Sequence, residues 1–190
     1  MHNIYIALIH YPVANKKGQT IASALTTIDM HDIARAVATF GAAGFYVVTP
    51  LEDQQTLAEE VMAHWRSGVG GIINPFRKQA LELIKVVAGF EEVKQDLKTE
   101  HKHGVVTVAT SAARYSGSVS VTELAQKMED NMAYVLAFGT AWGLAEDFVT
   151  GCDVIVEPIS GWNGYNHLSV RSAVSIILDR ISMKRKLFTL

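Results

Sequence analysis

Cysteine, proline and net charge are all scarce in this chain of 190 residues. The single cysteine, Cys152, excludes a disulfide within the chain and fits a reducing compartment. Because it begins an apolar run, we expect it to be a small core residue rather than a nucleophile. The N-terminal sequence has no basic leader, and its apolar run is too short to span a bilayer. We therefore expect a soluble cytoplasmic protein with no membrane partner.

A general surface for nucleic acid is also missing. The formal net charge is −2 and the isoelectric point is near 6.4, whereas general nucleic-acid binders are strongly basic. Contacts with RNA would have to come from a local patch or from a patch shared across a dimer. The nearest approach to a patch is Lys16, Lys17, Arg77 and Lys78, and scattered solvated charge is the alternative interpretation.

Several well-known site motifs are absent. No G-x-G-x-x-G follows the first apolar run, and NKKGQT only resembles part of a P-loop. There is no G-x-S-x-G nucleophile motif. His101 and His103 could form half of a metal site, but no second cluster of ligands accompanies them, so a solvated helix end is favoured and no metal is expected.

The pattern that is present alternates short apolar runs with amphipathic segments. Strands are expected over six runs: 4–9, 45–49, 85–88, 104–109, 133–138 and 153–156. Helices are expected over 30–40, with Asp29 as N-cap, and around 57–65, where Gly68–Gly71 would end the helix. Two further helices are expected over 75–83 and 91–98. The last two would follow the capping box Ser120–Glu123 and cover the apolar stripe Val170, Val174, Ile177 and Ile181. This alternation predicts a single α/β domain, residues 1–190, with a parallel six-stranded sheet covered by helices on both faces.

Three loops at expected strand ends carry small and polar residues. They are Thr110–Arg114, Gly139–Leu144 and Glu157–Ser169. Ligands bind at the carboxyl ends of strands in open α/β sheets, and small residues let the backbone approach a ligand closely. Each loop alone could be an ordinary turn. Trp142 and Trp162 add apolar rings, although each could instead fill the sheet edge as part of the core.

The last two loops resemble the cofactor loops of SPOUT methyltransferases, knotted α/β enzymes that use S-adenosylmethionine, mostly on RNA. Asn166–Arg171 (NHLSVR) is similar to the family motif L-N-V-S-V-A, with His167 in place of Asn and Arg171 in place of a small residue. Phe138–Leu144 (FGTAWGL) is similar to F-G-x-E-x-x-G-L without the Glu. Asp29, Arg35 and Gly41 match the spacing of the first motif, with Asp in place of Asn.

The resemblance implies a C-terminal trefoil knot that threads Glu157–Ser169, a homodimer, S-adenosylmethionine as cofactor, and a tRNA or rRNA substrate. The implied cofactor-binding residues are Thr110, Ser111, Ala112, Phe138, Gly139, Thr140, Gly143, Leu144, Glu157, Pro158, Ile159, Gly161, Asn166, His167, Leu168 and Ser169. The implied catalytic residues are Arg35 and His167.

Alternatives remain for these residues. Arg35 would hold an RNA phosphate or orient the acceptor, or it is a surface arginine paired with Asp32. His167 would act as a base or bind the cofactor's carboxylate, or it caps a helix as its first residue. Arg171 is a possible partner for Glu157 if that carboxylate is buried.

Three functions are therefore compared. The first is transfer of methyl groups to RNA. The second is a non-catalytic module that binds S-adenosylmethionine or a nucleotide, which the missing Glu of the second loop keeps open. The third is a small-molecule enzyme with Ser111 or Ser169 as nucleophile, and neither serine has a convincing base nearby in the sequence.

Overall fold

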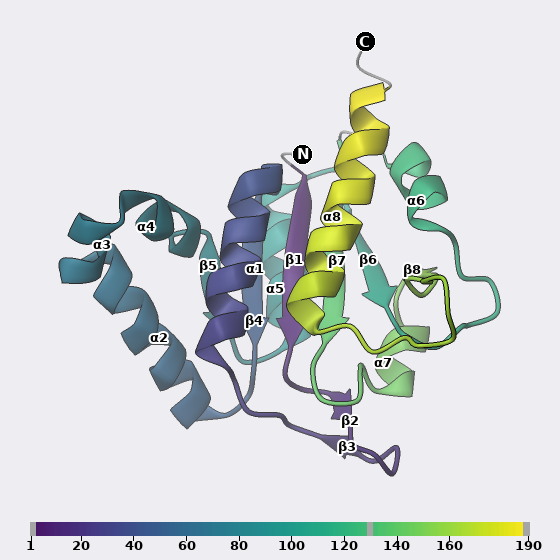
Figure 1. The fold of residues 1–190 in the computed structure, drawn as a ribbon, viewed down its shortest axis with the longest axis horizontal. Coiled ribbons are helices and arrows are strands. Elements are labelled where there is room, and N and C mark those ends of the chain that lie inside the picture. Colours follow the sequence, from purple (N-terminus) through teal and green to yellow (C-terminus); the bar gives the residue numbers. More distant parts are fainter. Residues whose placement is uncertain (1–2, 129–130, 188–190) are drawn as a thin grey trace.

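The computed structural model describes residues 3–128 and 131–187, and its centre is one parallel sheet (Figure 1). The six strands follow the order β5-β4-β1-β7-β6-β8 and all pair in parallel. Their bounds are β1 (Ile4–Ile9), β4 (Gly44–Val48), β5 (Ile84–Val87), β6 (Val105–Thr110), β7 (Ala133–Gly139) and β8 (Val154–Val156). The expected α/β class and the six expected strands are confirmed.

Helices cover both faces of the sheet, because alternate residues of the central strands point to opposite sides. Ile4, Ile6 and Leu8 of β1 belong to the core under α1, α2, α4, α6 and α8, whereas Tyr5, Ala7 and Ile9 belong to the core under α5 and α7. The helices are α1 (Thr27–Phe40), α2 (Glu52–Arg66), α3 (Val69–Ile73), α4 (Pro75–Leu81), α5 (Phe90–Glu100), α6 (Val121–Lys127), α7 (Glu146–Thr150) and α8 (Val170–Leu187).

The predicted helix ends are mostly confirmed. Asn74 accepts a hydrogen bond from the backbone N–H of Arg77, and Ser120 and Glu123 form a complete capping box. Gly41 ends α1 in the left-handed conformation, with φ of 66°.

The prediction of Asp29 as N-cap of the first helix is wrong. The helix begins at Thr27, and Thr26 is the extended residue before it. Asp29 lies inside the first turn, where its carboxylate accepts a hydrogen bond of 2.5 Å from the Thr26 hydroxyl. The apolar spacing alone placed the start three residues too late, because the first turn of α1 carries polar residues.

The helix α2 ends at Arg66, just before Gly68–Gly71, as the sequence predicted, but this segment also contains further structure. Gly70 and Gly71 lie within the short helix α3 and are buried. A Cβ on Gly71 would lie 2.2 Å from the backbone oxygen of Trp65, so glycine permits close packing there. Two other elements were missed by the sequence analysis: the hairpin of β2 (Val13–Ala14) and β3 (Thr20–Ile21), and α7. Both are too short to show a period.

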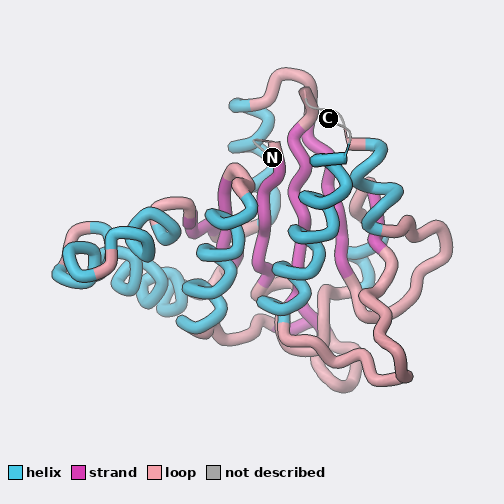
Figure 2. The backbone as a smooth tube through the Cα atoms, turned by 45° about the horizontal axis from the view of Figure 1, so that its top comes forward, coloured by secondary structure: helices cyan, strands magenta, loops and turns pink. Residues whose placement is uncertain are grey.

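The carboxyl ends of β7, β6 and β8 lie side by side at one edge of the sheet. Figure 2 shows the long loops gathered at this edge, beside the start of α8. The chain then runs back along α8, which packs against α1 and α6. The trefoil knot itself stays a prediction. Among the described residues, the structure has no helix of the length and apolarity that a membrane crossing requires.

The capping box of α6 generates a prediction about stability. Ser120→Ala removes the hydroxyl that accepts the hydrogen bond of 3.1 Å from the N–H of Glu123. We expect it to lower the free energy of unfolding by about 1 kcal/mol, measured by urea denaturation. Ser116→Ala is the matched control, because Ser116 is an exposed serine of the preceding turn. Equal effects of the two substitutions would contradict the capping role.

Candidate functional site

The first loop (Thr110–Arg114), the second loop (Gly139–Leu144) and the third loop (Glu157–Ser169) meet at the carboxyl edge of the sheet. The Asn166 side-chain amide donates a hydrogen bond of 3.0 Å to the backbone oxygen of Ala112, which joins the third loop to the first. The ring centroid of His167 lies 6.3 Å from that of Trp142, which joins the third loop to the second. The expected convergence of the three loops is confirmed.

The second loop is a tight turn that requires glycine at its start. A Cβ on Gly139 would lie 2.4 Å from the backbone nitrogen of Leu144, because the chain folds straight back on itself. Ala141 has φ of 50° and Gly143 has φ of 101°, so two residues adopt backbone angles that L side chains rarely adopt. The N–H of Gly143 closes the turn by donating to the oxygen of Thr140 at 2.8 Å.

The β2–β3 hairpin is a fourth element of the site, and the sequence analysis missed it. Ala14 donates its N–H to the oxygen of Gly143 at 2.9 Å and accepts a bond of 3.2 Å from the N–H of Trp142. The hairpin is thereby attached to the second loop like an extra strand. The signal for it was the turn sequence Asn15–Gln19, in which the Asn15 side chain accepts bonds from the N–H groups of Lys17 and Gln19.

A buried polar chain lies beneath the second loop. His10 follows β1 and is fully buried, with its Nδ1 3.0 Å from the Ser23 hydroxyl. Ser23 contacts the Thr140 hydroxyl at 2.5 Å, and Thr140 donates to the backbone oxygen of Ile9. Burial lowers the pKa of His10 to about 4, against the opposing charge of Asp29. His10 is therefore neutral at pH 7, and its Nε2 has no hydrogen-bond partner within the described residues.

The third loop leaves its backbone open. Within the described part of the chain, residues 158–168 make no backbone–backbone hydrogen bond. The space where Gly161 or Gly164 would carry a Cβ is empty. The Tyr165 N–H donates instead to the Asn163 side chain at 3.1 Å. Backbone N–H and C=O groups that do not bind other backbone groups, beside small residues, are what an adenine ring and a folded polar tail need from a protein. The residues present thus fit the expected S-adenosylmethionine.

The expected cofactor residues differ in what their side chains can do. Phe138 and Leu144 are buried and can only form apolar walls. The Thr110 hydroxyl donates to the backbone oxygen of Ala137. Ser169 accepts from the N–H of Ser172 at 3.3 Å and so sits at the start of α8. The half-buried members also include Ser111, Gly139, Thr140, Gly143, Glu157, Pro158, Ile159 and Asn166, and the exposed ones are Ala112, Gly161, His167 and Leu168.

His167 is not the first residue of a helix, because α8 begins at Val170. The alternative role of a helix cap is therefore wrong. Its exposed imidazole contacts two rings instead, with its centroid 6.3 Å from that of Trp142 and 5.9 Å from that of Tyr165. Neither Trp142 nor Trp162 fills the sheet edge, because their relative exposures are 59% and 109%.

Arg171 is not the partner of Glu157. Its guanidinium forms an ion pair of 2.7 Å with Asp29 and a longer one of 3.6 Å with Asp32. Asp29 and Arg171 are two positions at which the sequence departs from the SPOUT motifs, and the structure brings them into contact. The pair ties the first turn of α8 to the first turn of α1.

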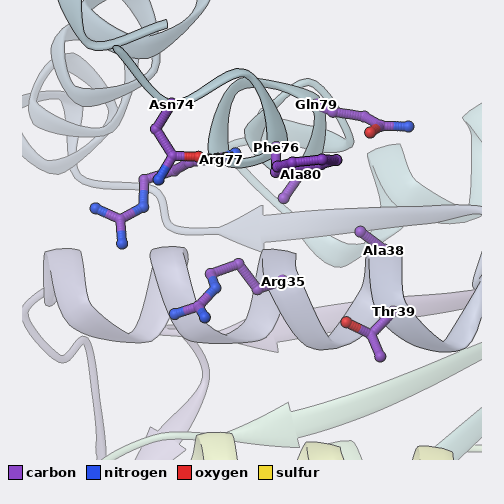
Figure 3. A pocket seen from close by; sticks show the side chains of 8 residues that line it. All are labelled: Arg35, Ala38, Thr39, Asn74, Phe76, Arg77, Gln79 and Ala80. Carbon is purple, nitrogen blue, oxygen red and sulfur yellow. Dashed lines mark hydrogen bonds between the residues drawn. The ribbon is translucent and has the colours of Figure 1, made fainter.

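Arg35 lies on the outer side of α1, where its guanidinium is 3.8 Å from Asp32. It lines a hollow of about 430 Å³ against α4, into which Figure 3 shows its side chain extending. It also lines a second hollow of about 650 Å³ against α8, whose far wall includes Arg171 and Ile176. Arg35 comes eight residues after the start of α1, about 12 Å along the helix from the edge where the loops meet.

Two further expectations concern reactive groups. Burial raises the pKa of the Cys152 thiol to about 11, so the thiol is protonated at neutral pH and the expected non-catalytic role fits. Among the described residues, no three histidine, cysteine or acidic side chains are placed to hold a metal ion. His101 accepts or donates a hydrogen bond of 2.8 Å with the Tyr5 hydroxyl.

Comparison with known sequences shows a family. Residues 3–183 match the family described as SAM-dependent RNA methyltransferase. A tRNA (guanine-N(1)-)-methyltransferase of Oleidesulfovibrio alaskensis is 44% identical over 94% of this chain, which spans 42% of that relative's length. An uncharacterised protein of Aquifex aeolicus is 34% identical over 97% of the chain and 90% of its own length.

Comparison with solved structures shows the fold. The TrmH/SpoU tRNA modifying enzyme of A. aeolicus covers the whole chain with a TM-score of 0.63 at 16% identity, over 78% of its own length. The SpoU methyltransferase AviRb from Streptomyces viridochromogenes, solved in complex with AdoMet, covers 98% of the chain with a TM-score of 0.58 at 18% identity, over 59% of its length. The SpoU-type fold expected from the motifs is confirmed.

The buried histidine generates a prediction about pH. The folded pKa of His10 is about 4, below the unfolded value of 6.5, so the unfolded state takes up a proton first. Stability conferred by neutral His10 is present above pH 6.5 and is lost as the pH falls towards 4, by at most about 3 kcal/mol. We expect the pH dependence of the unfolding free energy, wild type minus His10→Gln, to show this loss. Parallel curves for the two proteins would exclude it.

Proposed function

The chain belongs to the SAM-dependent RNA methyltransferase family, and we propose that it transfers the methyl group of S-adenosylmethionine to tRNA or rRNA in the cytoplasm. The observation that carries the proposal is the convergence of three strand-end loops, of which the third makes no backbone–backbone hydrogen bond over residues 158–168 within the described part of the chain. The printed name of one relative specifies N1 of guanine, but this chain matches less than half of that protein. The acceptor atom is therefore left open in the proposal.

The cofactor would lie across the second and third loops. Backbone groups of residues 158–168 would bind the adenine edge and the methionine tail, while Phe138, Leu144 and Ile159 would form the apolar walls. The solved AviRb complex shows that a SpoU-type fold holds AdoMet. When bound, the cofactor supplies an activated methyl group, and the transfer is an in-line displacement in which the protein's contribution is mostly positioning.

Proton removal is the second task of the chain. His10 is unsuited to it, because it is fully buried and its pKa is lowered to about 4. His167 is exposed where the second and third loops touch, so we assign it the role of proton acceptor. The hydroxyl groups of Ser111 and Ser169 both accept backbone hydrogen bonds and have no histidine as hydrogen-bond partner among the described residues. A serine nucleophile therefore has no support.

Arg35 would serve the loops of a second subunit. Its side chain lies on the face formed by α1 and α8, and Ile176 stays partly exposed on that face beside Phe40. A homodimer through this face would cover the apolar positions and bring Arg35 towards the partner's loops. The ion pair with Asp32 leaves the Arg35 side chain 59% exposed, so its guanidinium is available to a phosphate.

Binding and transfer can be measured separately. Isothermal calorimetry with S-adenosylmethionine should show binding by the wild type, and Gly139→Val should weaken it at least tenfold, because the turn cannot close over a side chain. Gly89→Ala is the control, since a Cβ there meets nothing within 4 Å. Labelled methyl transfer to total tRNA and rRNA tests catalysis. Cofactor binding with no transfer to either RNA would leave a non-catalytic binding module.

The role of Arg35 can be tested by mixing subunits. Arg35→Ala should lower methyl transfer by about 10- to 100-fold, the loss of a charged hydrogen bond, with cofactor affinity unchanged. Exchange of Arg35→Ala and Gly139→Val subunits should recover about a quarter of wild-type activity, because each heterodimer would keep one intact composite site. No recovery would place Arg35 in the site of its own subunit, and an unchanged rate in Arg35→Ala would remove it from the site.

A further inference from the structure

We propose that Trp142, Tyr165 and His167 form a stacking platform for an unpaired stretch of RNA, with Lys16 and Lys17 of the β2–β3 turn binding its phosphates. This inference rests on the proposed function, because it names the form of RNA that the loops would accept. It concerns side chains other than the apolar cofactor walls Phe138, Leu144 and Ile159, although Tyr165 and His167 belong to the third loop, whose backbone is assigned to the cofactor.

The platform consists of rings that the fold leaves in solvent. Trp142 and Tyr165 are 59% and 72% exposed, and the His167 ring contacts both of them. The Trp142 and His167 rings meet at an interplanar angle of 90°, so the edge of one ring meets the face of the other. Large rings cost free energy when exposed to water, and a cluster of them marks a binding surface.

Trp142 is held in place by its backbone. Its N–H donates to the oxygen of Ala14 at 3.2 Å, and the preceding residue, Ala141, has φ of 50°. That conformation costs a non-glycine residue free energy, and the loop retains it while projecting the indole outwards. A loop whose backbone is fixed before binding loses little entropy when a base stacks on the ring that it carries.

Lys16 and Lys17 follow closely along the chain from Ala14, the residue whose backbone binds Trp142. Ala14 is paired with Trp142, and Lys16 is two residues further on, about 7 Å of chain. The turn that carries the lysines is closed by the Asn15 side chain, which accepts bonds of 2.8 and 3.0 Å. Both lysines are exposed, and neither pairs with a carboxylate among the described residues.

The net charge of the chain favours unpaired RNA over duplex RNA as the ligand. With a formal net charge of −2, the chain has no overall excess of positive charge with which to bind the phosphates of a duplex. Unpaired bases offer faces on which aromatic rings stack, whereas paired bases bury those faces in the helix. A nucleotide stacked on Trp142 would also lie next to His167, which is the assigned proton acceptor.

The ring contribution can be measured with a defined probe. Fluorescence polarisation of a labelled 12-nucleotide oligo(U) should show binding that weakens on the order of tenfold in Trp142→Leu and Tyr165→Leu. Trp142→Phe should retain most of the affinity, because it keeps an aromatic face. Trp162→Ala is the matched control, a fully exposed tryptophan of the third loop with no ring against it among the described residues. Equal losses in Trp162→Ala and Trp142→Leu would overturn the platform.

The lysine contribution appears in the salt dependence. Two phosphate contacts with a single strand predict a slope of log K against log salt of about −1.4. Lys16→Gln with Lys17→Gln should reduce the slope towards zero, whereas Lys98→Gln with Lys102→Gln, exposed lysines on and after α5, should not. A slope unchanged by the first pair would remove these lysines from the surface.

Failure of this inference differs from failure of the proposed function. If Trp142→Leu loses S-adenosylmethionine binding in calorimetry but keeps oligo(U) affinity, the rings belong to the cofactor and the platform is wrong. If the wild type methylates RNA and Trp142→Leu does so equally well at low RNA concentration, the function stands and the platform is wrong. If no RNA is methylated but oligo(U) affinity depends on Trp142 as described, the platform stands and the proposed function fails.

Discussion

The candidate site depends on the parallel pairing of β7, β6 and β8. In a parallel sheet, neighbouring strands deliver their carboxyl ends to the same edge, so the three loops that follow them share one small region. Gly139 then lets the second loop turn sharply back on itself, because a Cβ there would lie 2.4 Å from the backbone nitrogen of Leu144. The Asn166 amide holds the third loop against the first. Without the strand order, these loops would be three unrelated turns.

A second constraint joins the two helices that flank the site. Asp29 is nearly buried, and an isolated carboxylate there would be costly, so Arg171 provides its counter-charge at 2.7 Å. Each residue alone is a departure from the SPOUT motifs, whereas together they form one ion pair. Asp29 also opposes, electrostatically, the lowering of the pKa of buried His10. The start of α1, the end of β1 and the start of α8 are thus linked through a single carboxylate.

At this edge of the sheet, some polar groups form hydrogen bonds within the protein, whereas others are left to bind a ligand. The hydroxyl groups of Thr110 and Thr140 are bonded to backbone oxygens of their own sheet, so they rigidify the loops rather than project into solvent. Among the described residues, by contrast, the backbone of residues 158–168 makes no hydrogen bond to other backbone groups, and the rings of Trp142 and Tyr165 stay exposed. This division supports cofactor recognition by backbone groups and RNA recognition by stacking, which suits a chain with a net charge of −2.

The sequence by itself determined the sheet, most helix ends and the three loops, because these depend on local patterns: apolar runs, the caps at Asn74 and Ser120, and glycine after a strand. Short motifs in the sequence also indicated the family. Only the tertiary structure decided what partners those residues have. The Asp29–Arg171 pair joins positions 142 apart in sequence, and the attachment of the β2–β3 hairpin to Trp142 depends on a strand pairing of two residues. Contacts between distant segments leave no periodic signal, since they are fixed by how the elements pack rather than by the residues beside them.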